Sequence, residues 1–194
     1  MSSTPAAKSA MAALIQEKYL ADRVFPAAAA AVAALRRDDF RVVLVTGSLD
    51  FIVRPLADAL GVDDVIANVL EEDVNTQTFT GRLEGVAVAD EEKRVRVLEY
   101  AAENDVDLSA SHAYGDSIAD LPMLECVGVA HAVSPSDALR ARAEEERWPV
   151  LTWKEDYLNE KKGKRNGNGN DENGGGENGG SSSSSTSSSS PALA

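Results

Sequence analysis

The sequence has little of what a disulfide-rich, membrane-spanning or nucleic-acid-binding protein needs. Cys126 is the single cysteine among 194 residues, which excludes an internal disulfide framework and indicates a reducing compartment. No apolar run approaches the roughly 20 residues of a membrane span. Basic residues are also scarce, 19 against 32 acidic ones, and the net charge of −13 repels nucleic acids and anionic membranes. We therefore expect a soluble protein whose surface attracts divalent cations.

The two ends of the chain differ in composition from the middle. Residues 159–194 are almost entirely polar, rich in Asn, Gly and Ser, and we predict a disordered low-complexity tail because burial cannot repay the entropy of ordering. Residues 1–24 are predicted to be a helical segment. Their first 14 residues are rich in Ala and Ser, with Lys8 and no acid, which is compatible with a plastid or mitochondrial transit peptide as well as with a frayed helix in a cytoplasmic protein. Residues 25–158 suit one domain, and the oligomeric state stays open.

Strands and helices are predicted to alternate along residues 25–158. Pro26 fits the first turn of a helix over 26–37, and the run 41–46, ended by Gly47, reads as a strand buried on both faces. Pro55 is predicted to open a second helix that ends at Gly61. A strand is predicted at 65–70, and residues 76–85, which turn at Gly81, are predicted to form a hairpin or an excursion from the sheet. A helix at 90–104 carries Val95, Leu98 and Ala102 on its apolar stripe. The remaining predicted elements are a strand at 112–115, a helix at 118–125, a strand at 127–132, a helix at 135–147 and a strand at 148–153. This alternation predicts an α/β fold with a parallel sheet and flanking helices, in which ligands bind beyond the carboxyl ends of the strands.

Two carboxylates four residues apart form the sharpest local feature, YGDSIADLPML at 114–124. Asp116 ends a predicted strand, and a helix beginning after it would turn Asp120 toward the same region of space. Their mutual repulsion then calls for a cation or an ammonium group. The alternative is that Asp116 or Ser117 only caps the helix while Asp120 points into water. The motif alone gives the two interpretations equal weight.

Two other features are weak when taken alone. Thr46 and Gly47 end a buried strand, where a hydroxyl and exposed backbone N–H groups can hold a phosphate oxygen, although small turn residues follow many strands. Lys93 lies early on a charged helix and is, by itself, a solvated surface lysine. Aimed at the two carboxylates, its ammonium group would offset their repulsion and bind phosphate.

In order and spacing, these features resemble motifs two to four of phosphatases of the haloacid dehalogenase superfamily, in particular the phosphoserine-phosphatase-like subgroup. The resemblance covers about residues 24–153. It implies a Rossmann-like fold, Mg²⁺-dependent hydrolysis of a phosphomonoester, and a small phosphorylated metabolite as the partner. By the same resemblance, Thr46 and Gly47 bind the phosphoryl group, Lys93 neutralises it and the carboxylates, Asp116 ligates Mg²⁺, and Asp120 positions that ion or its waters. Lys93 and Asp116 would be the catalytic residues present.

The first motif of that family, DxDx(T/S) after an apolar strand, is not found between Met1 and Arg41. Its first aspartate is the family's nucleophile and its second the general acid/base. The segment DVDLS at 105–109 matches the residue pattern of this motif, but it follows a charged helix and not a strand, and we interpret it as a turn. We expect a chain that lacks the central first strand and most of the cap, with a gap between the strands that end at Thr46 and Asp116, and that shows no turnover alone. The alternatives are an incomplete active phosphatase, a pseudo-phosphatase that binds a phosphorylated ligand, and an acidic interaction scaffold.

Overall fold

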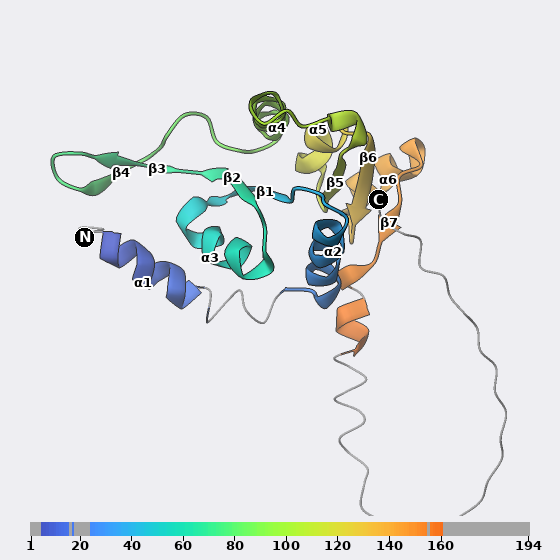
Figure 1. The fold of residues 1–194 in the computed structure, drawn as a ribbon, viewed down its shortest axis with the longest axis horizontal. Helices are drawn as coiled ribbons and strands as arrows, with labels where there is room; N and C mark the ends of the chain where they lie inside the picture. Colours follow the sequence, from blue (N-terminus) through green and yellow to red (C-terminus); the bar gives the residue numbers. More distant parts are fainter. Residues whose placement is uncertain (1–4, 16, 18–23, 155, 161–194) are drawn as a thin grey trace, which may run out of the picture.

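The computed structural model describes residues 5–15, 17, 24–154 and 156–160, and it shows an α/β fold (Figure 1). In chain order the elements are α1 (Pro5–Ile15), α2 (Pro26–Arg37), β1 (Val43–Leu49), α3 (Asp50–Leu60), β2 (Asp64–Asn68), β3 (Leu70–Asp73), β4 (Thr78–Leu83), α4 (Glu91–Glu103), the 3₁₀ turn η3 (Leu108–Ala110), β5 (His112–Gly115), the 3₁₀ turn η4 (Ile118–Asp120), α5 (Leu121–Leu124), β6 (Val129–Val133), α6 (Asp137–Glu146) and β7 (Val150–Leu151). The predicted tail lies outside the described residues from 161 on. Asn159 and Glu160, which we assigned to it, are helical instead.

The strands form two parallel units and one antiparallel hairpin. β1 pairs in parallel with β2, and β5, β6 and β7 form a three-stranded parallel sheet in that order. β3 and β4 form the hairpin, which extends away from both parallel units in Figure 1. Within the described residues β1 and β5 do not pair, which confirms the prediction that the strands ending near Thr46 and Asp116 are separated.

The best-packed core lies on one face of the β5–β6–β7 sheet. Small strand residues there let the helices approach closely, and the leucines Leu124 of α5 and Leu139 of α6 are fully buried against them. The remaining buried members of this cluster are Ala113, Ala130, Ala132 and Ala143. None of the helices in the described part of the chain combines the length and apolarity that crossing a bilayer requires.

Two predicted boundaries are wrong because tertiary contacts outweigh local signals. α3 begins at Asp50 and contains Pro55 in its interior. Proline donates no backbone hydrogen bond, but the burial of Val53 and Ala57 stabilises the helix on both sides of it. The hairpin turns between β3 and β4 at residues 74–77, while Gly81 lies inside β4 with φ of 86°. Asp73 fixes that turn, because its Oδ1 accepts from the N–H groups of residues 75 and 76 at 2.8 and 3.2 Å.

The bounds of α4 agree with the prediction, but its predicted apolar stripe is wrong. Val95 and Leu98 are 37% and 43% exposed, whereas Ala101 is buried. Lys93 and Val97 are half-buried on the inward side of the helix. The helix is therefore rotated so that Lys93, one of the candidate site residues, points into the protein.

β1 runs over Val43–Leu49 and not over the predicted 41–46, and β3 was not predicted. The remaining elements lie near their predicted positions. α2 and β5 match the predicted bounds, and the strands β2, β6 and β7 and the helix α6 are shifted or shortened by one or two residues at their ends. The predicted helix at 118–125 is a 3₁₀ turn followed by the single turn of α5.

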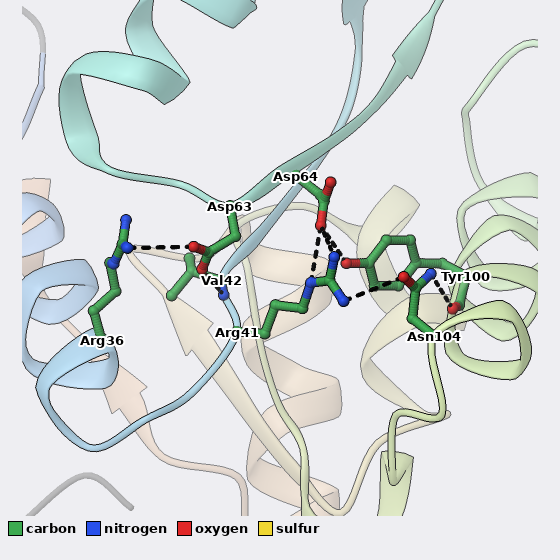
Figure 2. Close-up of polar contacts among 7 residues, drawn as sticks. All are labelled: Arg36, Arg41, Val42, Asp63, Asp64, Tyr100 and Asn104. Carbon is green, nitrogen blue, oxygen red and sulfur yellow. Dashed lines mark hydrogen bonds and ion pairs between the residues drawn. The ribbon is translucent and has the colours of Figure 1, made fainter.

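A polar cluster ties the starts of β1 and β2 to α4 (Figure 2). Arg41 donates to Asp64 Oδ2 through Nε at 2.9 Å and Nη2 at 2.8 Å, and the Tyr100 hydroxyl donates to the same oxygen at 2.5 Å. Arg41 Nη1 also donates to Asn104 Oδ1 at 3.2 Å. Burial and the neighbouring Asp64 carboxylate raise the pKa of Tyr100 to about 12. The cluster fixes the amino-terminal end of the β1–β2 unit, opposite to the end where the candidate site residues lie.

Candidate functional site

A buried ion pair forms the centre of the candidate site. Lys93, in the first turn of α4, places Nζ 2.5 Å from Oδ1 of Asp120, in the turn that follows β5. The two side chains are only 13% and 8% exposed. Each charge would be costly to bury alone, and in the ion pair each charge compensates the other. Lys93 is thus a buried partner of the carboxylate and not a solvated surface lysine.

The second oxygen of Asp120 organises the turn after β5. Oδ2 accepts from the N–H groups of Asp116 and Ser117 at 3.1 and 3.0 Å and from Ser117 Oγ at 3.1 Å. Gly115 is required for this packing, because a Cβ at that position would lie 2.7 Å from Asp120 Cβ. Ser117 therefore caps the turn, as one interpretation predicts, but Asp120 faces inward and not into water. Burial raises the pKa of Asp120, while Lys93 and the backbone donors outweigh that effect, so the net shift is downward.

Asp116 is exposed, and it borders a pocket of about 450 Å³. Partial burial and the negative charge of Asp120 raise its pKa, and Lys93 opposes that shift. The other lining residues come from the segments that follow β5, β6 and β7, the last of them helical at Lys154 and Leu158: Ser117, Ser134, Pro135, Ser136, Lys154 and Leu158. A carboxylate and an ammonium group at one pocket suit a ligand that carries both a cation and an anionic group.

Sequence reasoning missed Lys154 and Ser134 of this pocket. Lys154 follows β7, and its backbone N–H donates to Ser134 Oγ at 2.9 Å. Ser134 follows β6 directly and has φ of 41°. Both could have been found by the rule that identified Asp116, because each comes just after a predicted strand of the parallel sheet.

Thr46 and Gly47 lie where the pairing of β1 is interrupted. Val45 pairs with Ile66 and Leu49 with Asn68, so β1 carries two more residues than β2 across this interval. Such a bulge leaves backbone groups outside the ladder. Thr46 Oγ1 accepts from the Ser48 N–H at 3.1 Å, which closes a tight local turn. The backbone here is therefore arranged differently from the plain strand end that the sequence predicted.

Asn68, also missed by sequence reasoning, joins this turn to the segment before α4. Its Nδ2 donates to the Gly47 carbonyl at 2.7 Å, and its Oδ1 accepts from the Val88 N–H at 2.8 Å. Asn68 is 9% exposed, so both bonds are protected from water. A Cβ on Gly47 would lie 3.2 Å from the Val88 carbonyl oxygen, and this close approach favours glycine. No local signal marked Asn68, because the predicted strand at 65–70 placed it inside the strand, whereas β2 ends at this residue.

The structure thus brings together Lys93, Asp116 and Asp120 beyond the end of β5. Thr46 and Gly47 are connected to the same region through Asn68 and the segment that leads to Lys93. Within the described residues, no hydrogen bond or ion pair joins Thr46 or Gly47 to the other three. Their role in binding phosphate stays a prediction.

The carboxylates present do not by themselves complete a magnesium site. Across the part of the chain that the structure describes, no three His, Cys, Asp or Glu side chains gather in a way that could hold a metal ion. Both oxygens of Asp120 already accept hydrogen bonds, and burial together with the neighbouring Asp120 carboxylate raises the pKa of Asp116. Octahedral Mg²⁺ would then need most of its six oxygen ligands from water or from a bound ligand.

The segment DVDLS at 105–109 is a turn, as predicted. Asp107 caps η3, and its Oδ1 accepts from the backbone N–H of Ser109 at 2.8 Å and from its hydroxyl at 2.6 Å. The segment precedes β5, so it lies at the amino-terminal end of the strand whose other end leads to Asp116.

Comparison with known proteins shows the family to which the chain belongs. Residues 3–125 match the family model of the haloacid dehalogenase-like hydrolases. The chain is 42% identical over 112 residues to an inhibition of morphological differentiation protein of Streptomyces azureus, covering 57% of this chain and 39% of that protein. It is 36% identical over 104 residues to a phosphoserine phosphatase of Streptococcus thermophilus, covering 54% of this chain and 47% of the enzyme.

A solved structure from Bordetella pertussis, of a protein of unknown function, superposes with a TM-score of 0.72 at 29% identity. The match covers 77% of this chain and 68% of that one. The two curated relatives are longer, and this chain spans less than half of each. The family match extends over more than half of the chain and includes Thr46, Gly47, Lys93, Asp116 and Asp120. The chain therefore belongs to the haloacid dehalogenase-like hydrolase family.

Proposed function

We propose that this chain is the phosphate-binding part of a phosphomonoester hydrolase of the phosphoserine phosphatase type, and that its ligand is a small phosphorylated metabolite. The observation that carries the proposal is the buried Lys93–Asp120 pair beside Asp116, at the carboxyl end of a parallel strand. An ammonium group held in a mostly buried position can stabilise phosphoryl oxygens far better than one in open water.

Each residue has a distinct role in the proposal. Lys93 neutralises the phosphoryl group, and Asp120 holds the Lys93 side chain and the turn that carries Asp116. Thr46 and the Gly47 N–H contact other phosphoryl oxygens. Asp116, with Asp120 behind it, would hold Mg²⁺ weakly, and the ion, when bound, would supply positive charge against the phosphoryl oxygens. Lys154, which lines the same pocket as Asp116, contacts the remainder of the ligand.

We also propose that the chain alone does not turn over phosphomonoesters. Family chemistry needs an aspartate nucleophile, and no DxDx(T/S) segment follows an apolar strand in this sequence. A second candidate function is binding without turnover, as in a pseudo-phosphatase, which the same pocket supports. An acidic scaffold is the third candidate, and it rests on the net charge alone.

Binding and turnover assays together test the proposal. Calorimetry should show saturable binding of inorganic phosphate that strengthens with Mg²⁺, and Asp116→Asn should remove the magnesium-dependent part. Arg94→Ala, which removes an exposed cation from the same helix, should leave binding unchanged. Phosphoserine and an aryl phosphate should not be hydrolysed. Magnesium-dependent hydrolysis that Asp116→Asn abolishes would contradict the predicted inactivity, and an absence of phosphate binding would contradict the site itself.

A further inference from the structure

Both histidines of the chain, His112 and His131, lie in one row of aromatic side chains. His112 is on β5, and His131 is on β6, where it lies opposite Tyr114 in the parallel register. Because alternate residues of a strand point to the same face, these three side chains share one face of the sheet. The centroids of the two imidazoles are 5.4 Å apart, and those of His131 and Tyr114 are 4.5 Å apart. None of the phosphate-site residues described above belongs to this row.

A hydrogen bond joins the two imidazoles, and its direction follows from burial. His112 Nδ1 lies 3.1 Å from His131 Nε2. His131 is 4% exposed, and within the described residues its Nδ1 has no hydrogen-bond partner. A buried N–H group without an acceptor is rarer than a buried acceptor without a donor. His131 therefore carries its hydrogen on Nε2 and donates it to His112 Nδ1.

This arrangement requires both imidazoles to be neutral. His112 Nδ1 already accepts a hydrogen bond, and a proton added there would face the N–H group of His131. A proton added to Nδ1 of His131 would create a buried cation without an acceptor. Burial lowers the pKa of both imidazoles, and the neighbouring His112 lowers that of His131 further. Protonation therefore favours a structure in which the two rings separate and reach water.

No carboxylate in the described part of the chain bonds to either imidazole, so nothing compensates the charge of a protonated pair. His112 lines the cavity of about 590 Å³ between β1 and β5. Arg36 and Arg37 of α2 are exposed, as is Lys154 after β7. Among the ionisable residues of the cavity wall, one is exposed and the others bond to Asp64 or Ser109: Asp39, Arg41, Tyr100 and Asp107.

His112 also holds the segment that leads into β1. The Phe40 ring packs edge-on against His112, with centroids 5.5 Å apart and an angle of 85° between the ring planes. The Phe40 N–H donates to the Leu35 carbonyl at 3.0 Å, which joins Phe40 to the end of α2. Val32 and Leu35 line the same cavity as His112. Movement of His112 toward water would therefore release both Phe40 and α2 from β5.

The opposite face of the same sheet does not depend on the histidines. Leu124 of α5 and Leu139 of α6 are buried there against alanines that alternate with His112 and His131 along β5 and β6. One side of the sheet can therefore open while the sheet and α6 stay folded.

We propose that His112 and His131 form an acid-sensitive latch, which holds Phe40 and α2 against β5 at neutral pH and releases them when the imidazoles take up protons. Because folding lowers the pKa of both groups, the closed state has its full stability above the ordinary histidine value of about 6.5 and loses it as the pH falls. Each proton taken up on opening raises the opening equilibrium constant about tenfold per pH unit. Two histidines therefore give up to about a hundredfold rise per unit. The latch goes beyond the proposed function and does not depend on it.

Amide hydrogen exchange of the full chain at pH 7, 6 and 5, corrected for the intrinsic exchange rates, measures the opening. Between pH 6 and pH 5 the opening constant of residues 26–45 should rise between about tenfold and a hundredfold, and that of α6 should stay unchanged. Nitrogen chemical shifts of the imidazoles should show both rings as Nε2–H tautomers at pH 7. Both rings should titrate below pH 6.5.

Two variants separate the latch from other titrating groups. His112→Phe combined with His131→Phe keeps two rings in the row and leaves no histidine in the chain, while every carboxylate stays. Exchange in residues 26–45 of this variant should not change between pH 7 and pH 5. Tyr114→Phe is the matched control, because it keeps the ring and removes only a buried hydroxyl that has no partner in the described chain. It should retain the full pH dependence.

The proposal is overturned if exchange in residues 26–45 does not depend on pH, or if the variant without histidines keeps the same dependence. An equal loss of protection in α6 would show global unfolding and no latch. Titration of either imidazole at or above pH 6.5 would also refute it. Circular dichroism shows whether the double variant is folded, and if it is not, the imidazole titration and the exchange of the unchanged chain decide.

Discussion

Replacing Lys93 with methionine tests the centre of the site most directly. Methionine keeps the apolar stem of the side chain and removes the ammonium group that lies 2.5 Å from Asp120 Oδ1. Both partners are less than 15% exposed, so solvent screens their interaction only weakly. Removing one partner of such a pair typically lowers the free energy of unfolding by about 3–5 kcal/mol, because the other charge stays buried without compensation.

The loss should depend on pH, and its direction follows from the pKa of Asp120. Folding lowers that pKa, so the stabilisation is present above the unfolded value, about 3.9, and disappears as the pH falls through the lower folded value. In Lys93→Met the carboxylate loses its ammonium partner, and its pKa rises. The difference in unfolding free energy between the two proteins should therefore be largest near pH 7 and shrink toward pH 3, where Asp120 becomes protonated in the variant.

Urea unfolding followed by circular dichroism, from pH 3 to pH 8, measures this difference. Arg94→Met is the matched control, because Arg94 is the next residue on α4, is exposed, and has only a 3.9 Å contact with Glu91. It should change stability by less than about 0.5 kcal/mol at any pH. A loss below about 1 kcal/mol for Lys93→Met at pH 7, or a loss that does not vary with pH, would refute the buried pair as the organising contact of the site.

Three further predictions address residues around the same units. Gly115→Ala should cost about 1–3 kcal/mol of unfolding free energy in urea, because its Cβ would lie 2.7 Å from Asp120 Cβ; unchanged stability would mean that the turn has room to relax. Asn68→Leu should cost about 2 kcal/mol, since the Gly47 carbonyl and the Val88 N–H both lose their partner, whereas Asn75→Ala in the exposed hairpin turn should be nearly neutral in the same titration. In an ultraviolet absorbance titration, Tyr100→Phe should remove the tyrosine ionisation that occurs near pH 12. If the substitution instead removes an ionisation near pH 10, Asp64 does not raise the pKa of Tyr100.

Local chemistry was enough to predict most elements and the pair of carboxylates after β5. Helix α2 follows from Pro26 at its start and a run of alanines, and α3 ends where Gly61 adopts φ of 74°, a conformation that glycine tolerates best. The short strand His112–Gly115 followed by two carboxylates four residues apart was predictable because strand, turn and acidic spacing all lie within nine residues. Thr46, Gly47 and Lys93 were weak signals when taken alone, and only the family resemblance joined them to the two carboxylates.

Only the tertiary structure decided how these parts face one another. The helical period of α4 allows several apolar faces, and contact with Asp120 selects the rotation that buries Lys93 and exposes Leu98. Asn68 could not be recognised from its neighbours, because its two partners, Gly47 and Val88, lie 21 and 20 residues away in the chain. The separation of β1 from β5 was predicted from the family resemblance, but only the structure shows that side chains of α2 and α4 line the cavity between these two strands.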